Sequence, residues 1–115
     1  MLSEPAQERL ARNESFFREV NERIRDVGTG LVTAEEETTW EFICECPDPT
    51  CTERVTTTVA GYEAVRSSPR RFLVAPGHQE PEIEQVVAVD GERAIVEKQG
   101  PAGEIAVQLD PRRPR

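Results

Sequence analysis

The sequence predicts an α+β domain in which an N-terminal amphipathic helix packs on a small, mostly antiparallel sheet held together by zinc. Apolar residues recur at helical spacing over the first 28 residues, and from residue 39 they alternate with polar residues in short runs separated by turns. All three cysteines fall within residues 44–51. We expect one domain, with the helix at 1–28, a zinc-stapled α+β core at 39–109 and a flexible tail at 110–115.

The helix prediction begins at Ser3, a candidate N-cap, and ends at Gly28-Thr29-Gly30. Its apolar stripe repeats every seven residues and is interrupted by the polar Asn13. Such a stripe packs on its own chain or pairs with a second copy, and its short length favours packing. Phe16 lies beside the stripe and widens it. The stripe consists of Ala6, Leu10, Phe17, Val20, Ile24 and Val27.

A hairpin is predicted over residues 39–58, after a polar connector at 31–38. Trp40 to Cys46 alternates with period two, Pro47 to Thr50 has turn composition, and Glu53 to Thr58 is a threonine-rich return strand. Thr58 is then a candidate cap for a short helix that ends at Ser67-Ser68-Pro69.

The remaining elements are short. A strand is expected at 71–75, and Pro81 to Glu84 forms either a turn or one helical turn. The runs 85–89 and 93–98, joined by Asp90-Gly91, give the clearest hairpin signal in the chain. An edge strand is expected at 105–109 and a loose tail from Asp110 onward.

The cysteines and the one histidine predict a metal site. Cys44 and Cys46 are two apart on a strand, so their thiols point to the same side, and the following turn can bring Cys51 back to them. Zinc neutralises converging thiolates and favours four N or S ligands. His78, after the Pro76-Gly77 turn, is the natural fourth ligand. Two alternatives stay open, an iron–sulfur centre and ordinary half-buried hairpin residues.

Two resemblances rest on these residues. The spacing C-x-C-x4-C at Cys44, Cys46 and Cys51 resembles the post-SET zinc segment of histone lysine methyltransferases, which implies zinc binding and nothing about methyl transfer. The chain also resembles a group of short actinobacterial proteins in its stretches ARNESFFREVNERI, CECPDPTC, GYEAVR, RFLVAPGH and IVEK. That resemblance implies a shared fold in which the three cysteines and the PGH histidine occur together.

Charge limits the classes of partner. The net charge of -8 in 115 residues repels phosphate backbones and anionic lipid, so nucleic acid is an unlikely partner and no membrane association is expected. A nucleic-acid surface would have to use Arg66, Arg70, Arg71 and the tail Arg112-Arg113-Pro114-Arg115. No apolar run approaches the roughly 18 residues of a membrane span, and the N-terminus does not resemble a signal peptide. We therefore expect a cytoplasmic protein.

Catalysis has weak support in the sequence. His78-Gln79-Glu80 has the H-x-E form of zinc deaminases but lacks their following P-C-x-x-C, and four protein ligands leave no position for an activated water. Glu80 and Glu45 are the carboxylates to test for a zinc hydrolase. The favoured function is a small zinc-binding regulatory or adaptor module that binds another protein, or itself, through Phe16, Phe17 and Val20 on the helix. The alternatives are a nucleic-acid-associated zinc protein and, less favoured, a zinc-dependent hydrolase.

Overall fold

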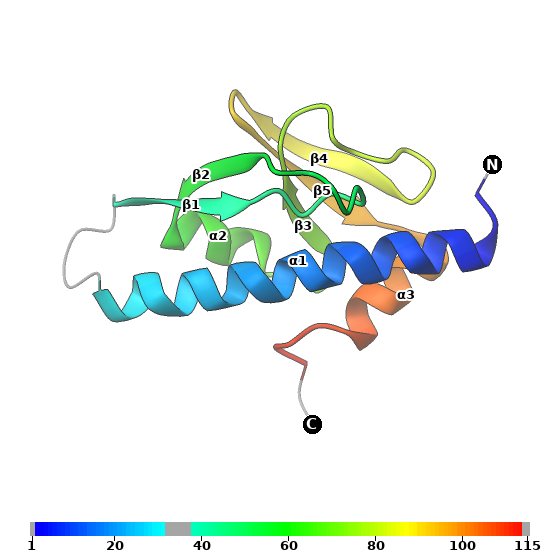
Figure 1. The fold of residues 1–115 in the computed structure, drawn as a ribbon, viewed down its shortest axis with the longest axis horizontal. Coiled ribbons are helices and arrows are strands. Elements are labelled where there is room, and N and C mark those ends of the chain that lie inside the picture. The colour runs from blue at the N-terminus through cyan, green and yellow to red at the C-terminus, as the bar shows by residue number, and fades with distance from the viewer. Residues whose placement is uncertain (1, 32–37, 114–115) are drawn as a thin grey trace.

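The computed structural model describes residues 2–31 and 38–113, and its α+β architecture confirms the predicted fold class (Figure 1). A long N-terminal helix runs along one side of the molecule, with the strands and the second helix above it and the third helix below it in Figure 1. The elements in chain order are α1 (Glu4–Leu31), β1 (Thr39–Ile43), β2 (Arg54–Thr58), α2 (Val59–Val65), β3 (Arg71–Val74), β4 (Glu84–Asp90), β5 (Arg93–Lys98) and α3 (Gly100–Gln108).

The described strands form two small antiparallel sheets where one was predicted. β1 and β2 make the predicted hairpin, with Trp40 opposite Thr57 and Phe42 opposite Val55. The second sheet has the order β3-β5-β4 and contains the predicted 85–98 hairpin. At α2, the Thr58 hydroxyl accepts a hydrogen bond from the Gly61 N–H, so the predicted helix cap is confirmed.

Three predicted boundaries are wrong. α1 continues through Gly28 to Leu31, because Gly28 is buried against the Trp40 and Val59 side chains rather than ending the helix. β1 ends at Ile43 instead of Cys46. The edge strand expected at 105–109 is part of α3, a helix with Pro101 in its first turn, where proline is tolerated. The undecided segment 81–84 is a turn followed by the first residue of β4.

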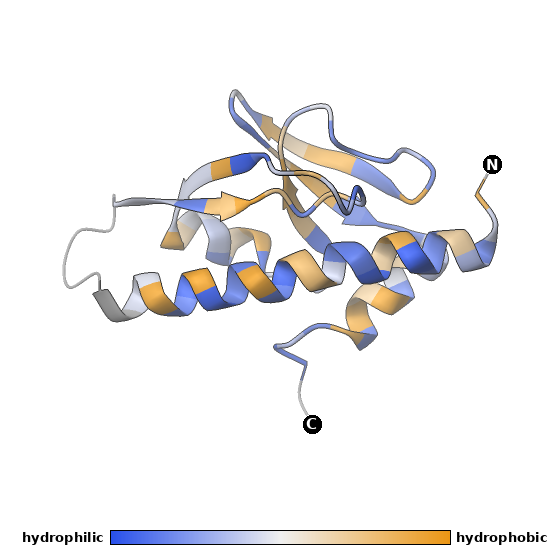
Figure 2. Ribbon diagram, viewed as in Figure 1, coloured by the Kyte–Doolittle hydropathy of each residue, from blue (hydrophilic) through white to orange (hydrophobic). Residues whose placement is uncertain are grey.

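The face of α1 that is buried most deeply is polar, which corrects the predicted packing face. The fully or almost fully buried residues are Ala11, Glu14, Ser15, Arg18 and Asn21. The apolar stripe lies on the flank of this face: Leu10 and Ile24 pack against core clusters, whereas 58% of Val27 is exposed. Along α1, apolar and polar positions accordingly alternate in Figure 2.

Buried ion pairs explain this polar face. The Lys98 ammonium on β5 binds the carboxylates of both Glu14 and Glu84, and all three side chains are fully buried. Arg18 donates hydrogen bonds of 2.7 Å to the carbonyls of Pro69 and Ala106. These partners lie far away in the sequence, so no local pattern shows that the polar positions of α1 face inward.

The C-terminal segment from Asp110 to Arg113, the last residue that the structure describes, is bound to the rest of the protein and is not a loose tail. Asp110 pairs with the buried Arg66, and Arg112 binds Glu22 and Glu63. Most of the predicted connector, residues 32–37, and the last two residues lie outside the described part of the chain. In that part, no helix combines the length and the apolar character that a membrane span needs.

Candidate metal centre

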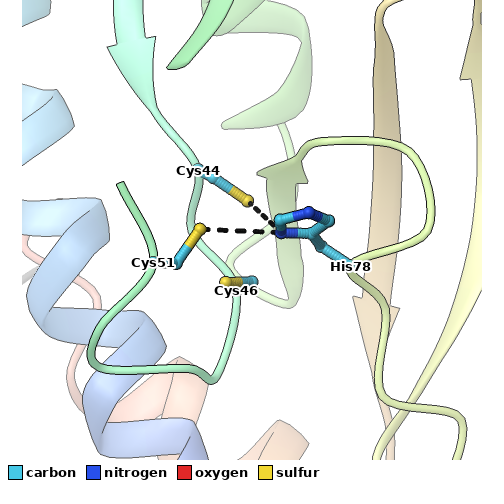
Figure 3. Close-up of side chains that lie close together, drawn as sticks. All are labelled: Cys44, Cys46, Cys51 and His78. Carbon is cyan, nitrogen blue, oxygen red and sulfur yellow. Dashed lines mark hydrogen bonds between the residues drawn. The ribbon is translucent and has the colours of Figure 1, made fainter. Parts of the chain in front are cut away.

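The structure brings together the side chains of all four predicted metal ligands (Figure 3). The ligand atoms of Cys44, Cys46, Cys51 and His78 all lie within 4.8 Å of one another. His78 presents Nδ1 to the thiols, at 3.6 Å from the sulfurs of both Cys44 and Cys51. Cys44 and Cys46 are buried, whereas Cys51 and His78 are partly exposed. The four ligands are therefore close enough to hold one metal ion.

Main-chain hydrogen bonds fix the two-cysteine segment after β1 has ended. The Cys44 N–H donates to the Glu53 carbonyl at 3.1 Å, and the Glu45 N–H donates to the Leu73 carbonyl at 2.8 Å. The chain thus stays paired with the segment before β2 at Cys44 and bonds to β3 of the second sheet at Glu45. This arrangement places Cys44 and Cys46 between the two sheets.

The turn that returns the chain to Cys51 is built around Asp48. The Asp48 carboxylate accepts hydrogen bonds from the backbone N–H and the hydroxyl of Thr50, at 2.8 and 2.7 Å, and the Thr50 hydroxyl holds the pKa of this carboxyl below its ordinary value. The Cys51 N–H donates to the Asp48 carbonyl. On the helix side, the Asn13 amide donates to the carbonyls of Cys46 and Pro47. Asn13, the polar interruption of the apolar stripe, therefore anchors the metal loop to α1.

His78 is placed by a tight turn after β3. Pro76 and Gly77 occupy its central positions, the His78 N–H donates to the Ala75 carbonyl, and Gly77 has φ of 88°. Proline followed by glycine at positive φ is the signature of a type II turn. The Ala75 N–H donates to the sulfur of Cys44 at 3.1 Å. A backbone donor to a thiolate stabilises its negative charge, so this segment supplies both a ligand and support for another ligand.

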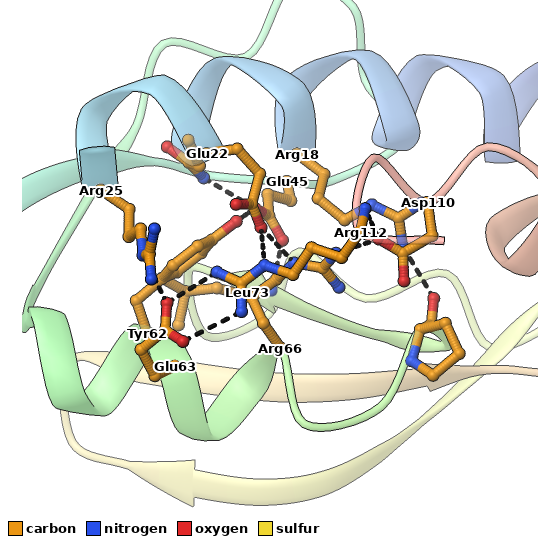
Figure 4. Close-up of polar contacts among 12 residues, drawn as sticks. Arg18, Glu22, Arg25, Glu45, Tyr62, Glu63, Arg66, Leu73, Asp110 and Arg112 are labelled. Atoms are coloured by element: carbon orange, nitrogen blue, oxygen red, sulfur yellow. Dashed lines mark hydrogen bonds and ion pairs between the residues drawn. The ribbon is translucent and has the colours of Figure 1, made fainter. Parts of the chain in front are cut away.

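Glu45, between two of the cysteines, has a structural role. Its fully buried carboxylate accepts hydrogen bonds of 2.8 Å from the Asn21 amide, the Tyr62 hydroxyl and the Leu73 N–H (Figure 4). Burial raises the pKa of Glu45, while these donors act in the opposite direction. These three hydrogen bonds tie the Glu45 carboxylate to α1, α2 and β3, so the side chain connects the metal loop to the core.

The two buried thiols, Cys44 and Cys46, hold their protons more tightly than ordinary thiols when no cation is present. Burial raises the pKa of Cys44, and burial also raises the pKa of Cys46 to about 11. A buried thiolate lacks solvation, so its charge must be compensated by another group. A divalent cation provides that compensation, and its binding releases the thiol protons.

The residues predicted for partner binding occupy different environments. Phe16 is 62% exposed, while Phe17 and Val20 are partly buried. The arginines considered for nucleic acid are largely engaged within the protein: Arg66 has a fully buried side chain paired with Glu22 and Asp110, and Arg71 lies 3.8 Å from Glu97. The prediction of Arg66 as part of a nucleic-acid surface is therefore wrong.

Comparison with models of known protein families finds no match, and comparisons with curated proteins and with solved structures find none either.

Proposed function

We propose that Cys44, Cys46, Cys51 and His78 bind one Zn²⁺ ion whose role is structural. The spacing of the ligand atoms carries the proposal. A tetrahedral ion with Zn–S bonds of about 2.3 Å and a Zn–N bond of about 2.05 Å separates sulfur from nitrogen by about 3.6 Å. The distances from His78 Nδ1 to the sulfurs of Cys44 and Cys51 are both 3.6 Å.

The spacing of the donors favours zinc over an iron–sulfur centre. A cluster spreads its protein ligands over several irons, whereas a single ion draws them around one point. A mutual separation within 4.8 Å fits a single ion. Three thiolates and one imidazole are also a common ligand set of structural zinc.

The number of ligands favours a structural over a catalytic role. Catalytic zinc keeps a position for water, and four protein ligands fill a tetrahedral shell. Binding joins the loop after β1 to the turn after β3, so the ion cross-links the two sheets. Structural zinc provides about 10–16 kcal/mol of apparent binding free energy. That exceeds or equals the roughly 5–15 kcal/mol of net stability typical of a domain, and removal of the metal should therefore unfold this protein.

We further propose that the zinc-stabilised domain is a cytoplasmic adaptor or regulatory module that binds another protein. The support is the exposure of Phe16 beside Phe17 and Val20 on α1. An exposed aromatic side chain next to apolar neighbours is typical of contact surfaces. Self-association through the same helix surface is the alternative. Sedimentation of the wild type and Phe16→Glu distinguishes the two, because only a dimer would dissociate in the variant.

The zinc proposal is tested by elemental mass spectrometry of untagged protein. We expect one zinc per chain in the wild type, and loss or strong weakening of binding in His78→Ala and Cys46→Ser. Glu80→Gln is the matched control, since Glu80 lies close to His78 in sequence but is not a ligand; it should keep its zinc. Reduced wild-type protein without metal, or His78→Ala with full zinc content, would refute the proposed site.

A further inference from the structure

Strand β4 is unusual because it is apolar and yet exposed. Of its seven residues, only Glu84 is buried. Its sequence from 85 to 89 is Gln-Val-Val-Ala-Val, a strong strand former. Among the described residues, four large hydrophobic side chains are exposed, and two of them, Val86 and Val89, lie on this strand. Figure 2 shows β4 as an orange strand at the periphery of the fold.

The outer edge of β4 is available for pairing. The sheet order is β3-β5-β4, so β5 covers one edge and no described strand covers the other. Asp90 and Arg93 flank a two-residue turn and form a hydrogen-bonded pair, so the next pair, Val89 with Ala94, is a non-hydrogen-bonded pair. The N–H and C=O of Val89 therefore point away from β5, toward the free edge.

A cavity of about 330 Å³ lies against the same end of the hairpin. Ala88, Asp90 and Arg93 of the hairpin line one side, and residues of β2 and α2 line the other. Thr57 in its wall is 4% exposed. Ala88 and Asp90 project to the cavity face of the sheet, because alternate residues of a strand share a face. A side chain from a strand added beside them would lie next to this cavity.

The charge around β4 specifies the kind of segment. Glu80 and Glu82 precede the strand, Asp90 is its last residue and Glu92 follows it, and the only basic residue in 79–95 is Arg93. Arg93 is already paired with Asp90. Two copies of β4 paired antiparallel would place acidic ends beside each other, in chains that each carry a net charge of -8. The edge therefore favours a cationic partner over a second copy.

We propose that the outer edge of β4 and the adjacent cavity bind an extended segment of another protein by strand addition, with apolar residues at its centre and Lys or Arg at its ends. Main-chain hydrogen bonds to Val89 give affinity, and one side chain of the segment enters the cavity and gives specificity. This proposal deepens the protein-binding role proposed above and rests on it, but it uses a surface separate from Phe16.

The test is selection of short random peptides on the zinc-loaded protein at about 50 mM salt, where ion pairing is weakly screened. We expect the selected sequences to combine β-branched residues with Lys or Arg. Hydrogen–deuterium exchange should show protection of the Val89 amide when a selected peptide is bound. Val89→Pro removes only an outward N–H, a change that edge strands tolerate. It should weaken binding by about tenfold or more, whereas Val89→Thr should keep it.

Equal affinity of the selected peptides for Val89→Pro and the wild type, or an unprotected Val89 amide in the complex, would overturn the proposal. Failure to select any peptide, or selection of acidic ones, would do the same. A wild-type dimer that Val89→Pro dissociates would assign the edge to a second copy instead. Zinc content is measured on each preparation. A fully zinc-loaded protein without edge binding contradicts this inference alone, whereas a metal-free preparation contradicts the proposed zinc site.

Discussion

Replacement of Glu45 by glutamine should destabilise the protein far more than its small change in size suggests. The Glu45 carboxylate is fully buried and accepts hydrogen bonds from the Leu73 N–H, the Asn21 amide and the Tyr62 hydroxyl. These donors come from β3, α1 and α2, so this one side chain connects the metal loop to three elements. Glutamine keeps the shape of the side chain but replaces one acceptor oxygen with an NH₂ donor.

The magnitude follows from the donors that lose their acceptor. The Tyr62 hydroxyl can rotate, but the Leu73 N–H and the Asn21 amide approach different carboxylate oxygens, and glutamine can serve only one of them. A buried donor without an acceptor costs about 1–3 kcal/mol. Removing a buried charge returns part of its desolvation cost, so we expect a net loss of about 1–3 kcal/mol.

Urea unfolding of the zinc-loaded protein measures this loss as a lower midpoint at an unchanged m value. The matched control is Glu41→Gln, an exposed glutamate on β1, which should stay within about 0.5 kcal/mol of the wild type. Equal midpoints for Glu45→Gln and Glu41→Gln would show that the three hydrogen bonds contribute nothing net. The reasoning about Glu45 would then be wrong.

Three further predictions concern α1 and its partners. Asn13→Ala should weaken zinc binding by about 10- to 100-fold in chelator competition, because it frees the metal loop, whereas Arg12→Ala should not. Burial raises the pKa of Glu14 well above 4.5, so folding takes up a proton and wild-type stability falls as the pH rises above that value. Glu14→Gln lacks this titration, so its urea midpoint should rise relative to that of the wild type between about pH 4 and about pH 8. A difference in midpoint that stays constant over this pH range would contradict the prediction. Arg66→Ala removes the ion pair of the nearly buried Asp110 and leaves Glu22 with Arg112 alone, so it should lose about 3–5 kcal/mol in the same assay, against almost no change for the exposed Arg23→Ala.

Local signals account for the parts of the fold that the sequence predicts. Asp90-Gly91 fixes the β4–β5 hairpin, and Gly91 indeed has a positive φ of 46°. Thr58 caps α2 through its own side chain. The four metal ligands belong to this group too, because their residue types are scarce in this chain and their turns are encoded nearby.

The parts that the sequence does not predict depend on distant partners. Glu14 and Lys98 are 84 residues apart, and Arg18 reaches a carbonyl 88 residues away, so neither the burial of these charges nor the polar packing face of α1 has a local signature. α3 was missed because its glycines and proline indicate a loop. Ala102, Ile105 and Ala106, buried at helical spacing, are the signal that could have identified it.

The polar docking of α1 bears on the role of the metal. Buried ion pairs fix one arrangement but add little net stability, since desolvation offsets most of their attraction. The contacts of Glu14, Arg18 and Asn21 therefore fix the position of α1 on the rest of the protein but add little to the free energy of unfolding. Asn13 and Asn21 both bind the segment that carries the cysteines. Without zinc, that segment loses its cross-link and α1 loses two of its anchors, so zinc binding and helix docking should be lost together as one cooperative event.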